Sequence, residues 1–121
     1  MKVDGGELLK RMREQRGYIL PAHETLAERD PDFLDGYNRM FMAANSDTSP
    51  LPADVRELII MALDVVAGLK AEVIRAHARK AVALGATEAQ VVNAIELAAM
   101  VFASRNMSPL STIFAKDSDS R

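Results

Sequence analysis

The sequence predicts an all-α protein, a helical bundle, and three observations lead to this fold class. Apolar residues recur at helical spacing along most of the chain, and the β-branched residues lie within these patterns instead of alternating as in strands. Prolines and glycines divide the chain into segments of helical length. A chain of 121 residues has the length of one domain, so we expect a single domain over residues 1–121.

The first half of the chain predicts three helices, over residues 7–16, 21–27 and 31–44. Gly17 ends the first helix, and Pro21 and Pro31 fall in the first turns of the other two. The polar, turn-rich residues 45–50 form a loop. We assign a cluster of four basic residues to the solvated face of the first helix: Lys10, Arg11, Arg13 and Arg16.

The second half predicts longer and more apolar helices. Pro52 opens a helix that Gly68 breaks, and the helix from Ala71 ends at Gly85. Thr87 and Gln90 then form a capping box for a helix that includes the run "LAAMVFA". Ser108 and Pro109 start a short helix ending near residue 115, and residues 116–121 form a frayed tail.

Two of these helices, over residues 55–67 and 91–103, have almost no polar face. A domain of this size has too little interior to cover both helices on every side. We therefore expect subunit contacts to cover the remaining faces in a homo-oligomer.

Composition excludes several classes of function. The net charge is −2 and no basic stripe with stacking aromatic residues exists, so we expect no nucleic-acid partner. The absence of cysteine excludes disulfides, thiolate nucleophiles and thiolate metal ligands. The longest apolar run covers residues 97–103, and the amino terminus has no signal-peptide pattern. We therefore expect a cytoplasmic protein without a membrane partner.

One polar residue stands out on the helix "AEVIRAHARKA", because His77 lies on its apolar face. Glu57 lies 11 residues before the break at Gly68, and His77 lies 9 residues after it. If the helices fold back on each other, the two residues differ in height by only ~3 Å and can meet. Such a pair is either an acid/base site or a buried structural contact.

The same residues argue against a metal site. His77, Glu57 and His23 offer two nitrogens and one carboxylate, but the chain has only two histidines and no HxxxH or HxH spacing. We therefore predict no metal.

From "LPADVRELIIMAL" through "HARKAVALGATEAQVVNAIELAAMVF", the sequence resembles the carboxymuconolactone decarboxylase family, whose fold is shared with alkyl hydroperoxidase D. The resemblance rests mainly on the motif "RELI", followed some twenty residues later by "HxxxAxxxGAT". The upstream "ETLAERDPDFLDGYNRMF" also resembles the preceding helix of family members, so the resemblance covers residues about 22–115.

The resemblance implies a function and its residues. One branch of the family decarboxylates 4-carboxymuconolactone in aromatic catabolism without a cofactor, and members assemble as trimers or hexamers. Glu57 and His77 match the family glutamate and histidine and would be catalytic. The CxxC thiols of the hydroperoxidase branch fall near Lys70 and Val73, so thiol peroxidase activity is excluded.

Two hypotheses follow for the function. The first is a decarboxylase-like enzyme acting on a small anionic lactone, with His23 and Arg105 as candidates, by residue type, to bind the substrate. The second is a non-catalytic ligand-binding or accessory subunit on the same fold. It is favoured by "FASRNMSPL", which stands where family members often carry a Gly-x-Pro segment.

Overall fold

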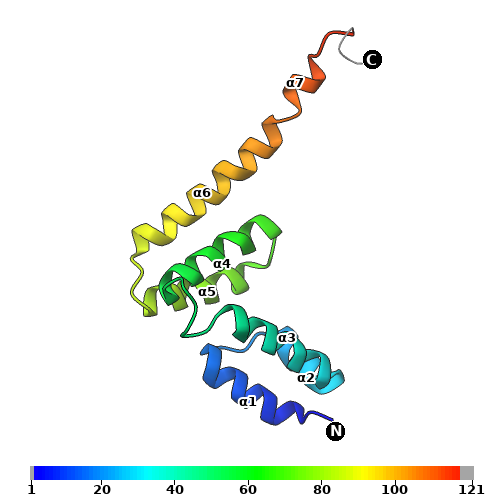
Figure 1. Ribbon diagram of the computed structural model, residues 1–121, viewed down its shortest axis with the longest axis vertical. Coiled ribbons are helices and arrows are strands. Elements are labelled where there is room, and N and C mark those ends of the chain that lie inside the picture. The colour runs from blue at the N-terminus through cyan, green and yellow to red at the C-terminus, as the bar shows by residue number, and fades with distance from the viewer. Residues whose placement is uncertain (1, 118–121) are drawn as a thin grey trace.

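The computed structural model describes residues 2–117, and all regular structure within them is helical, as predicted (Figure 1). The helices are α1 (Gly5–Arg16), α2 (Pro21–Arg29), α3 (Pro31–Ala44), α4 (Ala53–Ala67), α5 (Ala71–Ala83), α6 (Glu88–Met107) and α7 (Leu110–Ile113). The frayed tail predicted at residues 116–121 lies for the most part outside the described residues. No described helix is long and apolar enough to cross a membrane.

Helices α1, α2 and α3 form an amino-terminal unit with its own core, which consists of Leu8, Met12, Ala27 and Leu34. The cap of α1 is Asp4, whose carboxylate accepts a hydrogen bond from the Glu7 N–H at 3.0 Å. Residues 8 and 12 lie one turn apart on α1, so both side chains point into this core.

One prediction for α1 is wrong. Arg16 does not lie on the solvated face, because its side chain is only 1% exposed. It continues the buried stripe of Leu8 and Met12 at a spacing of four residues, which turns it inward with them.

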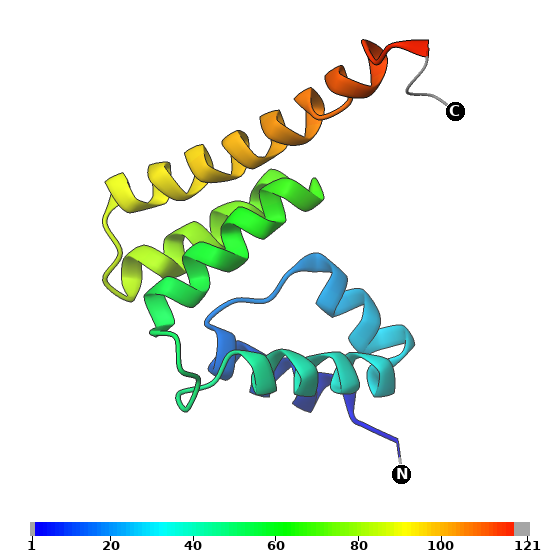
Figure 2. The same cartoon turned by 45° about the horizontal axis from the view of Figure 1, so that its top comes forward.

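Helices α4 and α5 form the predicted hairpin, and Gly68 ends α4 with a φ of 75°. Its N–H donates to the carbonyls of Asp64 and Val65, which closes the last turn of α4. Figure 2 shows α4 and α5 side by side, with α1–α3 on one side of the pair and α6 on the other.

Helix α6 packs along α4 and α5 and then extends past them (Figures 1 and 2). Thr87 and Gln90 form the predicted capping box, with bonds of 3.1 and 2.9 Å. The helix continues to Met107, so Ser108 ends α6 instead of starting the short helix. The reason is local, since the Ser108 N–H donates to the Ser104 carbonyl in the pattern of a continuing helix.

Candidate functional site

His77 from α5 and Glu57 from α4 meet across the hairpin, as their heights predicted. His77 Nδ1 lies 2.7 Å from Glu57 Oε2, and the two residues are 5% and 1% exposed. Glu57 sits one turn before Met61, so it shares the buried stripe of α4. The contact therefore joins the facing sides of α4 and α5.

The surroundings of Glu57 favour its ionised form. Burial raises the pKa of a carboxyl, but here the hydrogen bond and charge of His77 outweigh burial and lower the pKa of Glu57. Lys80 Nζ at 3.6 Å and the Asn45 amide at 3.4 Å act in the same direction. A carboxylate at Glu57 fixes the tautomer of His77, because it requires a proton on Nδ1.

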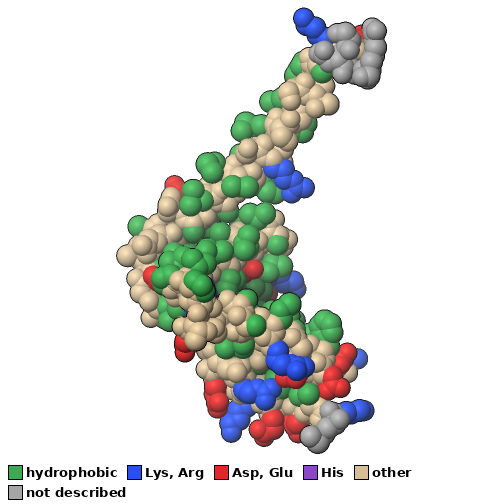
Figure 3. All heavy atoms as spheres, viewed as in Figure 1, with side chains coloured by type: hydrophobic (Ala, Val, Ile, Leu, Met, Phe, Trp, Pro, Cys, Tyr) green, Lys and Arg blue, Asp and Glu red, His purple; other side chains and the backbone are tan. Residues whose placement is uncertain are grey.

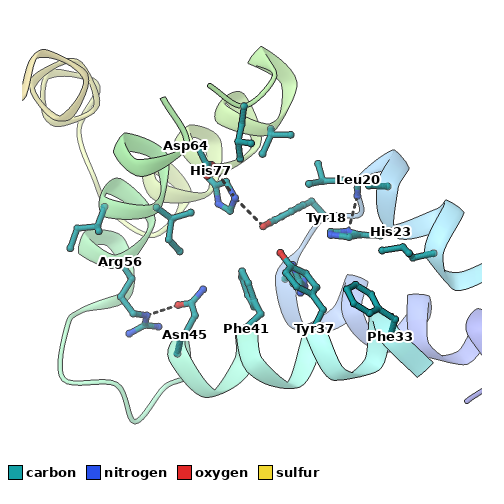
Figure 4. Close-up of a pocket in the computed structure, with 18 of the residues that line it drawn as sticks. Tyr18, Leu20, His23, Phe33, Tyr37, Phe41, Asn45, Arg56, Asp64 and His77 are labelled. Carbon is teal, nitrogen blue, oxygen red and sulfur yellow. Dashed lines mark hydrogen bonds and ion pairs between the residues drawn. The ribbon is translucent and has the colours of Figure 1, made fainter. Parts of the chain in front are cut away.

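The other ring nitrogen of His77 faces two oxygens. Nε2 lies 3.4 Å from the Tyr18 hydroxyl and 3.6 Å from Asp64 Oδ2. The Tyr18 ring also meets the imidazole edge-on, with 5.4 Å between ring centroids (Figure 4). Burial raises the pKa of Tyr18 to about 12, so its hydroxyl keeps its proton and can donate.

Asp64 is a carboxyl that the sequence analysis did not single out. Among the described residues, its Oδ2 atom is buried without a hydrogen-bond partner. Burial and the negative charge of Glu57 raise the pKa of Asp64, although the charge of His77 opposes them. The sequence did carry a signal, because Asp64 follows Glu57 by seven residues, which is close to two helical turns.

A cavity of about 640 Å³ opens in front of His77, between the α4–α5 hairpin and the amino-terminal unit. Figure 4 shows Tyr18, Tyr37 and Phe41 reaching into it from one side and His77 from the other. The lining is mostly apolar and includes Leu20, Leu26, Phe33, Leu51, Ile59, Ile60, Leu69 and Val73. A cavity of this size with few polar groups is typical of a small-molecule site.

Glu57 does not line this cavity. It borders a second hollow of about 420 Å³ together with Lys80, and this hollow shares Phe41, Asn45 and Arg56 with the first cavity. His77 lines the first cavity and is bonded through Nδ1 to Glu57, which does not line it. A ligand in the cavity can therefore approach Nε2 of His77.

His23 lines the cavity, whereas Arg105 does not. The Nδ1 atom of His23 accepts a hydrogen bond from the Leu20 N–H at 3.1 Å. Burial and the charge of Arg16 lower the pKa of His23 to about 4, so its ring is neutral near pH 7. Arg105 lies near the end of α6 against the ring of Phe102, and its role in substrate binding stays a prediction.

The described residues contain no group of three His, Cys, Asp or Glu side chains that could hold a metal ion. The side chains gathered around His77 can take part in proton transfer. His77 can exchange a proton with a ligand at Nε2, Glu57 compensates the charge of the ring, and Tyr18 can donate a hydrogen bond. No disulfide or thiol takes part, because the sequence has no cysteine.

Comparison of the chain with curated proteins and with solved structures gives no match. The comparison with protein families does give one, to the carboxymuconolactone decarboxylase family over residues 31–111. The matched part runs from α3 into α7 and contains both Glu57 and His77, while α1 and α2 precede it. Because the match covers most of the sequence, and the fold is all-helical as the family requires, the chain belongs to the carboxymuconolactone decarboxylase family.

Proposed function

We propose that this protein is a cofactor-independent acid/base enzyme that decarboxylates a small anionic lactone or a related acid. The observation that carries the proposal is the position of His77 between a buried carboxylate at 2.7 Å and an apolar cavity. Catalytic roles for Glu57 and His77 are part of the proposal. The family to which the chain belongs supports this class of reaction over others.

The proposed reaction needs three contributions from the protein. When the carbon–carbon bond to the leaving carboxylate breaks, carbon dioxide departs. The electron pair of that bond stays with the substrate and moves into its carbonyl group. The apolar walls of the cavity desolvate the leaving carboxylate. The Tyr18 hydroxyl is placed to donate a hydrogen bond to the enolate that forms, in the manner of an oxyanion donor.

His77 completes the reaction by protonating the carbon that lost carbon dioxide. With protons on both ring nitrogens, it donates one from Nε2, and the Glu57 carboxylate stabilises the charge that the ring carries beforehand. After the transfer, the neutral Nε2 atom can accept the hydrogen bond of Tyr18. The proton must return from solvent, and Lys80 beside Glu57 is partly exposed on that side.

A second function is a non-catalytic ligand-binding or accessory subunit. The observation in its favour is that the Glu57–His77 pair satisfies itself within the protein, as a structural pair would. In that case the cavity binds a ligand without transforming it.

Carbon dioxide release over a panel of lactone acids separates the two functions. We expect release with at least one acid, and we expect His77→Gln to reduce it by about 10²–10⁴-fold while the helical content is kept. Thermal stability is measured on the same samples. A His77→Gln protein that turns over normally per folded molecule, or a wild-type protein that releases no carbon dioxide from any acid, contradicts the proposal.

A further inference from the structure

We propose that two arginines make the cavity an anion-binding site: Arg56 binds the carboxylate of the ligand directly, and the buried Arg16 supplies a second positive charge. The inference rests on the proposed function only for the size and class of the ligand, a small organic carboxylate. It assigns anion recognition to residues other than His23 and Arg105, the two that the sequence brought forward.

Arg16 is a fully buried cation whose side-chain hydrogen-bond acceptor is a neutral asparagine. Its Nε and Nη2 atoms both donate to Asn38 Oδ1, at 3.1 and 2.9 Å. Its guanidinium lies over the ring of Phe41, 3.7 Å from the centroid, and 5.3 Å from that of Tyr37. Arginines this deeply buried are almost always ion-paired. Among residues 2–117 no carboxylate lies within ion-pair distance of Arg16.

Arg56 is held in the same way from the other side of the cavity. Its Nε atom donates to Asn45 Oδ1 (Figure 4), and its Nη1 atom donates to the Leu51 carbonyl at 2.6 Å. Both acceptors are neutral, and the described part of the chain again provides no carboxylate within ion-pair distance. Arg56 is only half-buried and lines the cavity, so a ligand can reach it.

The two asparagines that hold these arginines are related by the geometry of α3. Asn38 lies within α3, and Asn45 is the residue that caps its carboxyl end. An asparagine oxygen fixes the position of a guanidinium but leaves its charge uncompensated, whereas an aspartate would neutralise it. Side chains of α3 and of its cap thus orient one arginine from each half of the molecule without neutralising its charge.

Among the other titratable groups that line the cavity are one carboxyl, Asp64, and the imidazole of His23. Burial raises the pKa of Asp64, which opposes its ionisation, and the lowered pKa of His23 keeps that ring neutral near pH 7. Glu57 does not line the cavity, and its carboxylate is bonded to His77 Nδ1 at 2.7 Å and lies 3.6 Å from Lys80 Nζ. The charge of Arg16 opposes the effect of burial on the pKa of Tyr18 and adds to the effect of burial on the pKa of His23. The charge of Arg16 therefore acts on side chains that line the cavity.

An equilibrium binding experiment tests the inference without requiring turnover. The probes are γ-butyrolactone-γ-carboxylate and its uncharged amide, titrated by calorimetry at low and constant ionic strength because salt screens charges. We expect the wild-type chain to bind the acid more tightly than the amide. Arg56→Gln should weaken acid binding by roughly 10–100-fold and leave amide binding within about twofold, because a hydrogen bond to a charged group is lost.

Asn38→Asp tests the buried charge with almost no change of shape. The new carboxylate would pair with Arg16 but would lose the hydrogen bond that Asn38 Nδ2 donates to Gln15 Oε1, so we expect the fold to be kept together with about tenfold weaker acid binding. The matched control is Arg79→Gln, which removes the same charge from the exposed face of α5 and should leave acid binding unchanged.

Three outcomes overturn the inference. The first is equal binding of the acid and the amide by the wild-type chain. The second is no detectable binding of the acid by the wild-type chain. The third is unchanged acid binding in both Arg56→Gln and Asn38→Asp. Binding of the acid without release of carbon dioxide would contradict the proposed reaction alone and leave this inference standing. The His77→Gln chain, which we expect to be inactive, should still bind the acid, and this result would separate anion binding from the reaction.

Discussion

At the residue scale, the two ring nitrogens of His77 differ because they face different neighbours. Nδ1 is bound to Glu57, and Nε2 faces the cavity beside Tyr18 and Asp64. The lowered pKa of Glu57 and the pKa of about 12 at Tyr18 fix which of these partners carries a proton near pH 7. One nitrogen of the ring is therefore bonded to a buried carboxylate, and the other faces the cavity.

Replacement of Tyr18 by phenylalanine isolates the hydroxyl from the ring. The edge-on contact with His77 is kept, while the donor at 3.4 Å is lost. If the hydroxyl stabilises an enolate, we expect kcat to fall by about 10–100-fold with KM nearly constant. Thermal stability should change by less than about 1 kcal/mol, since the bond is long and only partly buried. A loss of stability with unchanged kcat would assign the hydroxyl to structure.

His23 predicts a pH dependence of stability. Its pKa is 6.5 in the unfolded chain and about 4 when folded, so the unfolded state binds more protons between these values. Stability from this group is complete above pH 6.5 and is lost as the pH falls towards 4, by at most about 3 kcal/mol.

The variant that tests this dependence is His23→Asn, whose side-chain oxygen can still accept the Leu20 N–H. Urea unfolding from pH 7 to 4 should give a smaller decline for the variant than for wild type. Parallel declines would show that other groups account for the loss.

The sequence predicted some of these residues and missed others for identifiable reasons. Glu57 and His77 could be found because a polar residue on an apolar face breaks a helical pattern. Arg16 also lies on such a face, but three neighbouring basic residues concealed it in a cluster that resembles a solvated surface. Tyr18 lies between helices, where no periodicity shows which way a side chain points.

At the scale of elements, the α4–α5 hairpin sets the geometry of the site. Because Gly68 fixes where the chain reverses, it also fixes which residues of the two helices lie at the same height. The sequence was sufficient to predict this register. It could not predict how α1–α3 pack against the hairpin, because that contact depends on side chains far apart in the chain, such as Tyr18 and His77.

Gly68→Ala tests the reversal. With a φ of 75°, alanine at this position is strained, and we expect a loss of about 1–2 kcal/mol in unfolding free energy. Gly36→Ala is the control, because it lies within α3 where an added Cβ meets nothing within 4 Å. That change should stabilise the chain by about 0.5–1 kcal/mol. Urea unfolding measures both, and a stabilising Gly68→Ala would contradict the role of this turn.

At the scale of the whole molecule, much apolar surface is left open. Helix α6 has 20 residues, of which only Ala98 is buried. Figure 3 shows hydrophobic side chains along its length and over the adjoining hairpin. Large side chains of α6 and the segment after it are between 44% and 79% exposed: Val92, Leu97, Met100, Val101, Phe102, Met107, Leu110, Ile113 and Phe114. Apolar surface this extensive on one helix is typical of an interface.

We therefore predict a homo-oligomer, a trimer or hexamer, in which α6 packs against neighbouring copies. Leu97 and Val101 lie one turn apart and are 53% and 55% exposed, so Leu97→Glu together with Val101→Glu would place two charges in the interface. Light scattering should give a multiple of 13.2 kDa for wild type and a smaller mass for the double variant. Arg75→Glu, on the exposed face of α5, should keep the wild-type mass. A wild-type chain that stays monomeric at micromolar concentration would show that α6 carries its apolar surface without a second copy, and the prediction would be wrong.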